Sequence, residues 1–134
     1  MRVFLDTNVL VSAFAARGLC ADLLEVVLAD HDLVTGRSVL RELAKALRQK
    51  VRLTDPRATE IADFVAREAV EVVEEAAPAT VRVDPDDALV LGEALRGRAE
   101  CFVTGDGALL ELEKVEGLRI QSPRQLWEAL HRDT

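Results

Sequence analysis

The sequence predicts an α/β fold, a three-layer sandwich in which a central parallel sheet of four or five strands lies between two layers of helices. Short apolar runs alternate along the chain with longer segments whose apolar residues recur at helical spacing. The first run, Arg2–Leu5, is followed at once by an acid, which is typical of a short buried parallel strand. The chain has 134 residues, 49% of them hydrophobic, and no repeat or linker. We therefore expect one domain over residues 1–134.

The first quarter of the chain predicts two strands and two helices. After the strand Arg2–Leu5, the segments Val9–Ala16 and Leu19–Ala29 carry apolar residues at helical spacing. Asp32–Thr35 is the second predicted strand, and Gly36 ends it.

The middle of the chain predicts three helices and a third strand. Ser38 can cap a helix that runs to about Lys50, and Asp55-Pro56 opens another that extends to about Val72. Thr80–Val83 is the third predicted strand. Asp84-Pro85 then supplies the cap and the first residue of the next helix.

The last third of the chain completes the pattern. Cys101–Thr104 is the fourth predicted strand, and Leu118–Ile120 is a candidate fifth. Ser122-Pro123 begins a final helix that extends through Leu130.

Acidic residues follow four of the predicted strands. Asp6 closes the first strand, and Glu42 lies one turn into the helix after the second. Asp86 and Asp87 open the helix after the third, and Asp106 comes directly after the fourth. Sites in parallel α/β sheets form in the crevice beyond the carboxyl ends of the strands, so we expect these acids to meet there.

A cluster of carboxylates predicts a hard divalent cation. Carboxylates within a few ångströms repel one another, and without a cation some of them must bind protons. No histidine or cysteine accompanies the set, so oxygen ligands favour Mg²⁺ or Mn²⁺ over zinc. A cation held in this way can activate water for attack on a phosphodiester.

Each acid also has a local explanation. Asp86 and Asp87 lie in the first turn of a helix, where the helix dipole favours acids, and Asp106 lies in a Gly-Asp-Gly turn. Asp6 has no local task except capping the next helix, which Thr7 or Asn8 can do instead. The functional interpretation therefore depends on the convergence of the four sites.

Four motifs in order along the whole chain resemble those of PIN domains. Leu5-Asp6-Thr7-Asn8-Val9-Leu10-Val11-Ser12 is similar to the opening motif of that family, and Glu42 falls at the family's second acid. Asp84-Pro85-Asp86-Asp87-Ala88-Leu89 resembles the third acidic motif, and Phe102-Val103-Thr104-Gly105-Asp106 resembles the fourth. Gly107-Ala108 differs from the more polar residues that often follow the fourth acid.

The resemblance implies a ribonuclease that cuts single-stranded RNA with Mg²⁺ or Mn²⁺. It assigns the metal and catalytic places to Asp6, Glu42, Asp87 and Asp106. It gives Thr7, Asn8 and Thr104 the task of orienting carboxylates or water. Asp86 and Asp87 can exchange roles, and we prefer Asp87 as the acid because it directly precedes Ala88-Leu89.

The chain most resembles the small PIN-domain toxins of VapBC-like toxin–antitoxin pairs. The resemblance therefore also implies an antitoxin partner and a homodimer. Residues 1–5 are too short for a signal peptide, and no apolar run approaches the ~20 residues that span a bilayer, so we expect a cytoplasmic protein without membrane contact. We expect Cys20 and Cys101 to be buried thiols.

The net charge of −7 opposes a general affinity for nucleic acid. Residues 37–52, however, contain six basic residues and one acid. A helix would place four of the bases on one face, as a candidate track for the RNA backbone: Arg37, Arg41, Lys45 and Arg48. Arg52 would join this face if the helix ran that far. The same face can instead be a solvated helix surface or the docking site of an acidic antitoxin.

Two other functions remain open. The first is a PIN fold that only binds RNA or protein, although none of the four acids is missing. The second is an aspartate-based phosphatase or phosphotransfer domain. It fits poorly, because the phosphatase pattern needs an acid where the chain has Asn8, and the receiver pattern needs a lysine that does not follow Thr104.

Overall fold

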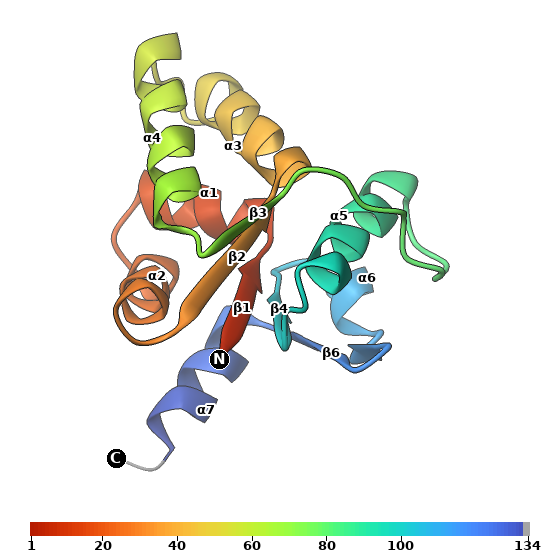
Figure 1. Ribbon diagram of the computed structural model, residues 1–134. Coiled ribbons are helices and arrows are strands. Elements are labelled where there is room, and N and C mark those ends of the chain that lie inside the picture. The colour runs from red at the N-terminus through yellow and green to blue at the C-terminus, as the bar shows by residue number, and fades with distance from the viewer. Residues whose placement is uncertain (133–134) are drawn as a thin grey trace.

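A six-stranded, mostly parallel sheet forms the centre of the computed structural model, which describes residues 1–132 (Figure 1). The strand order is β3-β2-β1-β4-β6-β5, and only the pairing of β5 with β6 is antiparallel. In chain order, the elements are β1 (Arg2–Leu5), α1 (Thr7–Ala15), α2 (Leu19–Asp30), β2 (Asp32–Gly36), α3 (Arg37–Gln49), α4 (Asp55–Glu68), β3 (Glu71–Val73), α5 (Pro85–Arg96), β4 (Cys101–Val103), α6 (Gly107–Leu110), β5 (Lys114–Val115), β6 (Leu118–Gln121) and α7 (Pro123–His131).

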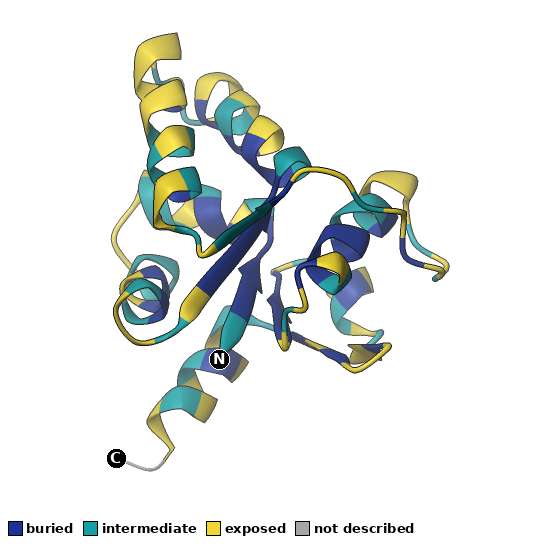
Figure 2. Ribbon diagram, viewed as in Figure 1, coloured by how far each residue is buried: buried dark blue, intermediate teal, exposed yellow. Residues whose placement is uncertain are grey.

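Helices cover both faces of this sheet. Helices α2 and α5 contact β2 from opposite sides, and α7 packs against α2 and β6 (Figure 1). The strands between them are almost wholly buried, as Figure 2 shows for β1, β2 and β4. On neighbouring strands, the rings of Phe4 and Phe102 stack with centroids 5.5 Å apart. The predicted three-layer α/β class is therefore confirmed.

The third strand is not the one that the sequence predicted. Thr80–Val83 forms bends, whereas β3 is Glu71–Val73, in the segment predicted as the end of the preceding helix. Helix α4 already ends at Glu68, and the N–H of Val70 donates to the carbonyl of Leu33 in β2 at 2.8 Å. The β-branched residues that follow suit an extended edge strand better than a helix, and pairing with β2 decides between them.

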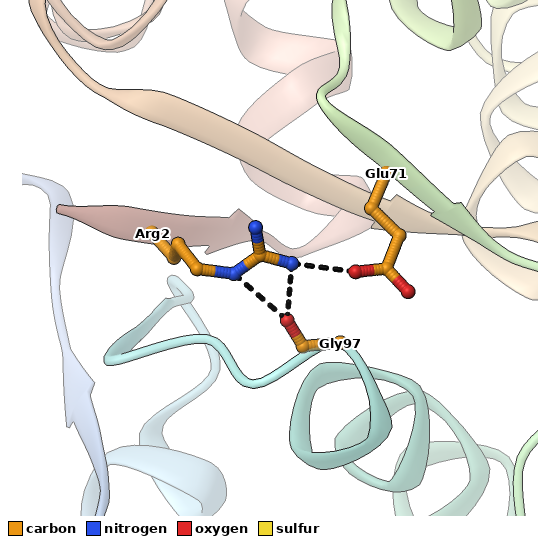
Figure 3. Close-up of polar contacts among 3 residues, drawn as sticks. All are labelled: Arg2, Glu71 and Gly97. Atoms are coloured by element: carbon orange, nitrogen blue, oxygen red, sulfur yellow. Dashed lines mark hydrogen bonds and ion pairs between the residues drawn. The ribbon is translucent and has the colours of Figure 1, made fainter.

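A half-buried arginine fixes this edge strand to the rest of the fold. The Arg2 guanidinium contacts Glu71 Oε1 at 2.6 Å and donates two hydrogen bonds to the carbonyl of Gly97 (Figure 3). Arg2 thus joins β1 to β3 and to the C-terminal end of α5. The opposite end of α5, which carries Asp86 and Asp87, extends toward the carboxyl edge of the sheet.

The sheet also has more strands than the four or five parallel ones predicted. The additional strand β5 has two residues and forms a hairpin with β6. Glu116 and Gly117 in its turn both adopt positive φ, at 48° and 88°. So short an antiparallel strand has no recognisable period in the sequence.

Within residues 1–132, no helix combines the length and the apolar character needed to cross a bilayer. Both cysteines are free: Cys101 is buried, as predicted, and Cys20 is half-buried.

Candidate active site

A cleft of about 450 Å³ brings the predicted acids together. It opens where β1 leads into α1, and its other walls come from α3, α5 and Asp106 in the loop between β4 and α6. Five acidic side chains line it: Asp6, Glu42, Asp86, Asp87 and Asp106. The cleft thus contains all four acids that the resemblance assigned, together with the alternative Asp86.

Asp6 is the most tightly held of these acids. It is 8% exposed and is itself the N-cap of α1, with Oδ1 accepting the N–H of Thr7 at 2.8 Å. Its Oδ2 accepts hydrogen bonds from the Thr104 hydroxyl at 2.8 Å and the Asn8 amide at 3.1 Å. Burial raises the pKa of Asp6, the hydrogen bonds from Thr104 and Thr7 counteract that rise, and the charge of Asp106 adds to it.

The same polar groups tie the loop after β4 to the start of α1. Asn8 Oδ1 accepts the N–H of Gly105 at 3.0 Å, and the Thr104 hydroxyl oxygen accepts the N–H of Asp106 at 3.1 Å. The predicted neighbours of the acids therefore do contact them. Asn8 and Thr104 form one network between Asp6 and Asp106.

Asp106 caps a helix with one carboxylate oxygen and also lines the cleft. Its Oδ1 caps α6 by accepting the N–H groups of Ala108 and Leu109 at 2.8 and 3.3 Å. Its Oδ2 accepts no hydrogen bond from any residue in the described range 1–132. The capping bonds fix the carboxylate and leave one oxygen available to the cleft.

Asp86 and Asp87 enter the cleft from the first turn of α5. Asp84 caps this helix by accepting the N–H of Asp86 at 2.9 Å. Asp86 is exposed, whereas Asp87 is half-buried. Burial raises the pKa of Asp87, and the negative charges of Asp6 and Asp106 raise it further. The negative charges of Asp6 and Asp106 therefore both act on Asp87.

Glu42 reaches the cleft from α3, whose first turn has an unexpected cap. Ser38, the predicted cap, lies inside the helix, and its N–H donates to the carboxylate of Glu93 at 3.0 Å. The residue at the cap position is Gly36, which has no side chain to cap with. A Cβ on Gly36 would overlap the Glu93 carboxylate, so the glycine leaves the space that this buried acid occupies.

Sequence reasoning missed Glu93, which is 2% exposed. Burial raises the pKa of Glu93, whereas hydrogen bonds from Ser38 and the charge of Arg41 lower it. Its Oε1 has no hydrogen-bond partner among the described residues. An acid flanked in α5 by the buried residues Leu91, Gly92 and Ala94 was the available signal.

The four predicted RNA-binding bases lie outside the cleft wall. Arg37 makes a bidentate contact with Glu74, with N–O distances of 2.7 and 3.0 Å, and Arg48 lies 3.4 Å from Asp55. Arg41 and Lys45 are exposed on α3. The base that does line the cleft is Lys50, the C-cap residue of α3, which the predicted track omitted.

The acids surround an open cleft and do not enclose a cage. Within residues 1–132, no group of three or more His, Cys, Asp or Glu side chains lies close enough to enclose a metal ion. The charged oxygens that face the cleft are all carboxylate oxygens, the donor type that suits Mg²⁺ and Mn²⁺.

Comparisons with known proteins agree with this architecture. A family model described as PIN domain matches residues 2–108. No curated protein sequence matches the chain.

Two solved structures share the fold. VapBC2 from Rickettsia felis, bound to a DNA fragment from its promoter, is 17% identical to this chain, with a TM-score of 0.66. The match covers 91% of this chain and 98% of the Rickettsia felis chain. DNA-bound VapBC from Salmonella typhimurium is 18% identical, with a TM-score of 0.60 and coverages of 92% and 98%. Both similarities concern the whole architecture described above.

Proposed function

Because the chain belongs to the PIN-domain family, we propose that it is a divalent-metal-dependent ribonuclease that hydrolyses phosphodiester bonds of single-stranded RNA. The observation that carries this proposal is the gathering of Asp6, Asp87 and Asp106 in one cleft, close enough for two of them to raise the pKa of the third. Like charges arranged in this way favour the binding of a cation over a structural role for each acid alone.

The donor set fits Mg²⁺ or Mn²⁺. Mg²⁺ typically takes one or two carboxylates and keeps several waters, so a cleft without a three-acid cage suits it. Asp6 and Asp87 are the first candidates to hold the ion, with Glu42 and Asp106 on adjoining walls. When bound, the cation would supply Lewis acidity that activates water and offsets the charge of the attacked phosphate.

The residues around the acids support this role by fixing their orientation. Asp6 accepts three hydrogen bonds, which hold both of its oxygens in place before any ligand arrives. Thr104 donates to Asp6 and accepts from the N–H of Asp106, so it also fixes the spacing of those two acids. Asp87 accepts no hydrogen bond in the described part of the chain, which leaves both of its oxygens for a cation.

We further propose that the chain is the toxin of a toxin–antitoxin pair, with a protein antitoxin as partner. The two structures named above, both VapBC, support this proposal by their fold. A homodimer remains an expectation from the resemblance. The alternative is a PIN fold that binds RNA without cutting it, and the complete set of acids in the cleft argues against it.

The deciding experiment is cleavage of a labelled single-stranded RNA by the purified protein. We expect cleavage with Mg²⁺ or Mn²⁺ and none with EDTA. Asp6→Asn should lower the rate by more than about 100-fold, since it removes a charge that supports the cation. Asp63→Asn removes an exposed carboxylate from α4, outside the cleft, and is the matched control.

Two outcomes would contradict the proposal. If metal-loaded protein cuts no RNA while Asp6→Asn leaves metal binding unchanged, the catalytic role of the cleft is wrong. If the protein binds RNA but leaves it intact under every metal condition, the binding-module alternative holds instead.

A further inference from the structure

The acid-lined cleft has a basic end. Among the residues that line it, Lys50 is the one base, and it shares its wall with Glu42 and Ala46. These three residues are spaced by four along α3, so they follow one another on the same face of the helix. Ala46, which lies between Glu42 and Lys50, has only a methyl group to project into the cleft.

The position of Lys50 is not explained by local structure. As the C-cap residue of α3, it lies where the helix dipole favours a cation, which accounts for the residue type but not for a place in the cleft. Lys50 forms no ion pair with any acid of residues 1–132, whereas Arg37 and Arg48 on the same helix each do. Its ammonium group is therefore available to a ligand in the cleft.

We propose that Lys50 binds a backbone phosphate of the substrate strand that is not the phosphate being cleaved. Glu42 and Lys50 are eight positions apart, so their backbones lie roughly 12 Å apart along the helix axis. They stand at the two ends of the α3 wall of the cleft, so a strand that places one phosphate at the acids can place another at Lys50. The ligand is single-stranded nucleic acid, held through its charge.

This arrangement answers the difficulty that the net charge poses. A chain with a charge of −7 and five acids in its cleft repels a polyanion unless cations offset the repulsion. A metal ion would do so at the acidic end, and Lys50 does so at the other end. The strand then lies along the wall of α3, with Val11 and Ser12 of α1 among the other lining residues.

The inference rests on the proposed function, and its test separates the two. Lys50→Ala should raise KM for a labelled RNA by about five- to tenfold, the effect of losing one charge-assisted contact, and leave kcat within about twofold. The slope of log KM against log salt should fall by about 0.7, the contribution of one phosphate contact on a single strand. Lys50→Arg should retain most of the wild-type behaviour. Lys114→Ala removes the same charge from an exposed residue of β5, which does not line the cleft, and should change neither KM nor the salt slope.

A chemical variant identifies the phosphate. Replacing single phosphates of the RNA by uncharged methylphosphonates should reveal one position, distinct from the cleaved bond, where wild type and Lys50→Ala become equal. If no position equalises them, or if Lys50→Ala keeps the wild-type KM and salt slope, the role assigned to Lys50 is wrong. A fall in kcat alone would also contradict it, because it would place Lys50 at the cleaved bond.

Binding measured by fluorescence anisotropy in EDTA separates this inference from the nuclease proposal. Wild-type protein that binds RNA through Lys50 but never cuts it would support the phosphate contact and overturn the nuclease proposal. Cleavage that is indifferent to Lys50 would overturn only the phosphate contact. Neither binding nor cleavage would overturn both.

Discussion

Glu93 offers a sharp test of how α3, the helix that carries Glu42 into the cleft, is held in place. Its carboxylate accepts the N–H of Ser38 where Gly36 leaves the helix without a capping side chain. Glu93→Ala would leave that N–H unpaired, at a cost of about 1–3 kcal/mol. We therefore expect the free energy of unfolding to fall by about 1–3 kcal/mol, the cost of the unpaired N–H.

The isosteric change Glu93→Gln isolates the charge. Because burial raises the pKa of Glu93 above its ordinary 4.5, the folded protein binds this proton more tightly than the unfolded chain does. The wild type therefore has the full contribution of this group below pH 4.5 and loses stability as the pH rises through the raised pKa. Glutamine has no such proton, so its stability relative to the wild type should improve from pH 4.5 upward.

Urea denaturation followed by circular dichroism at several pH values between 4 and 8 measures this difference. Asp6 and Asp87, whose pKa values are also raised, are present in both proteins, so their contributions to the pH dependence of stability cancel in the difference. A difference between wild type and Glu93→Gln that stays flat with pH, or that shifts in favour of the wild type as pH rises, would refute the reasoning. Equal stability of Glu93→Ala and wild type would refute the capping role.

Three further predictions concern other parts of the fold. Asp87→Asn should reduce metal binding and should raise the melting temperature in EDTA by a few degrees, because it relieves the repulsion that raises the pKa of Asp87. A lower melting temperature would contradict this prediction. Gly92→Ala should cost about 1–3 kcal/mol in urea denaturation, because a Cβ there would overlap a backbone carbonyl, whereas Gly107→Ala meets open space and should change stability little. Burial raises the pKa of the Cys101 thiol to about 11, so iodoacetamide at pH 8 should label Cys20 and spare Cys101. Labelling of both cysteines in the native protein would contradict the burial of Cys101.

Sequence periodicity located most of the sheet, because buried parallel strands are apolar runs. Cys101–Thr104 and Leu118–Ile120 became β4 and β6 within a residue at each end. The third strand was missed because Glu71–Val73 follows a helical segment without a glycine or proline to separate them. Its pairing with β2, and the ion pair between Arg2 and Glu71, join residues far apart in the chain. No local pattern contains that information.

In the candidate site, too, the residues with local sequence motifs were predicted, and those defined by long-range contacts were not. The acids were found because each has a local motif, and Asp6, Glu42, Asp87 and Asp106 do share a cleft. Their catalytic and metal-binding roles stay predictions.

Glu93 and Lys50 were missed for a physical reason. The importance of Glu93 comes from its contact with another helix. That of Lys50 comes from which face of α3 borders the cleft. Helical periodicity placed four other bases on one face but could not show which face meets the acids.

Binding of Mn²⁺ followed by electron paramagnetic resonance tests most directly whether the cleft is a metal site. Wild-type protein should bind Mn²⁺, and both Asp6→Asn and Asp87→Asn should weaken that binding by about tenfold or more. Asp63→Asn should leave it unchanged. Mn²⁺ binding that is absent in the wild type, or that survives both cleft substitutions undiminished, would contradict the account.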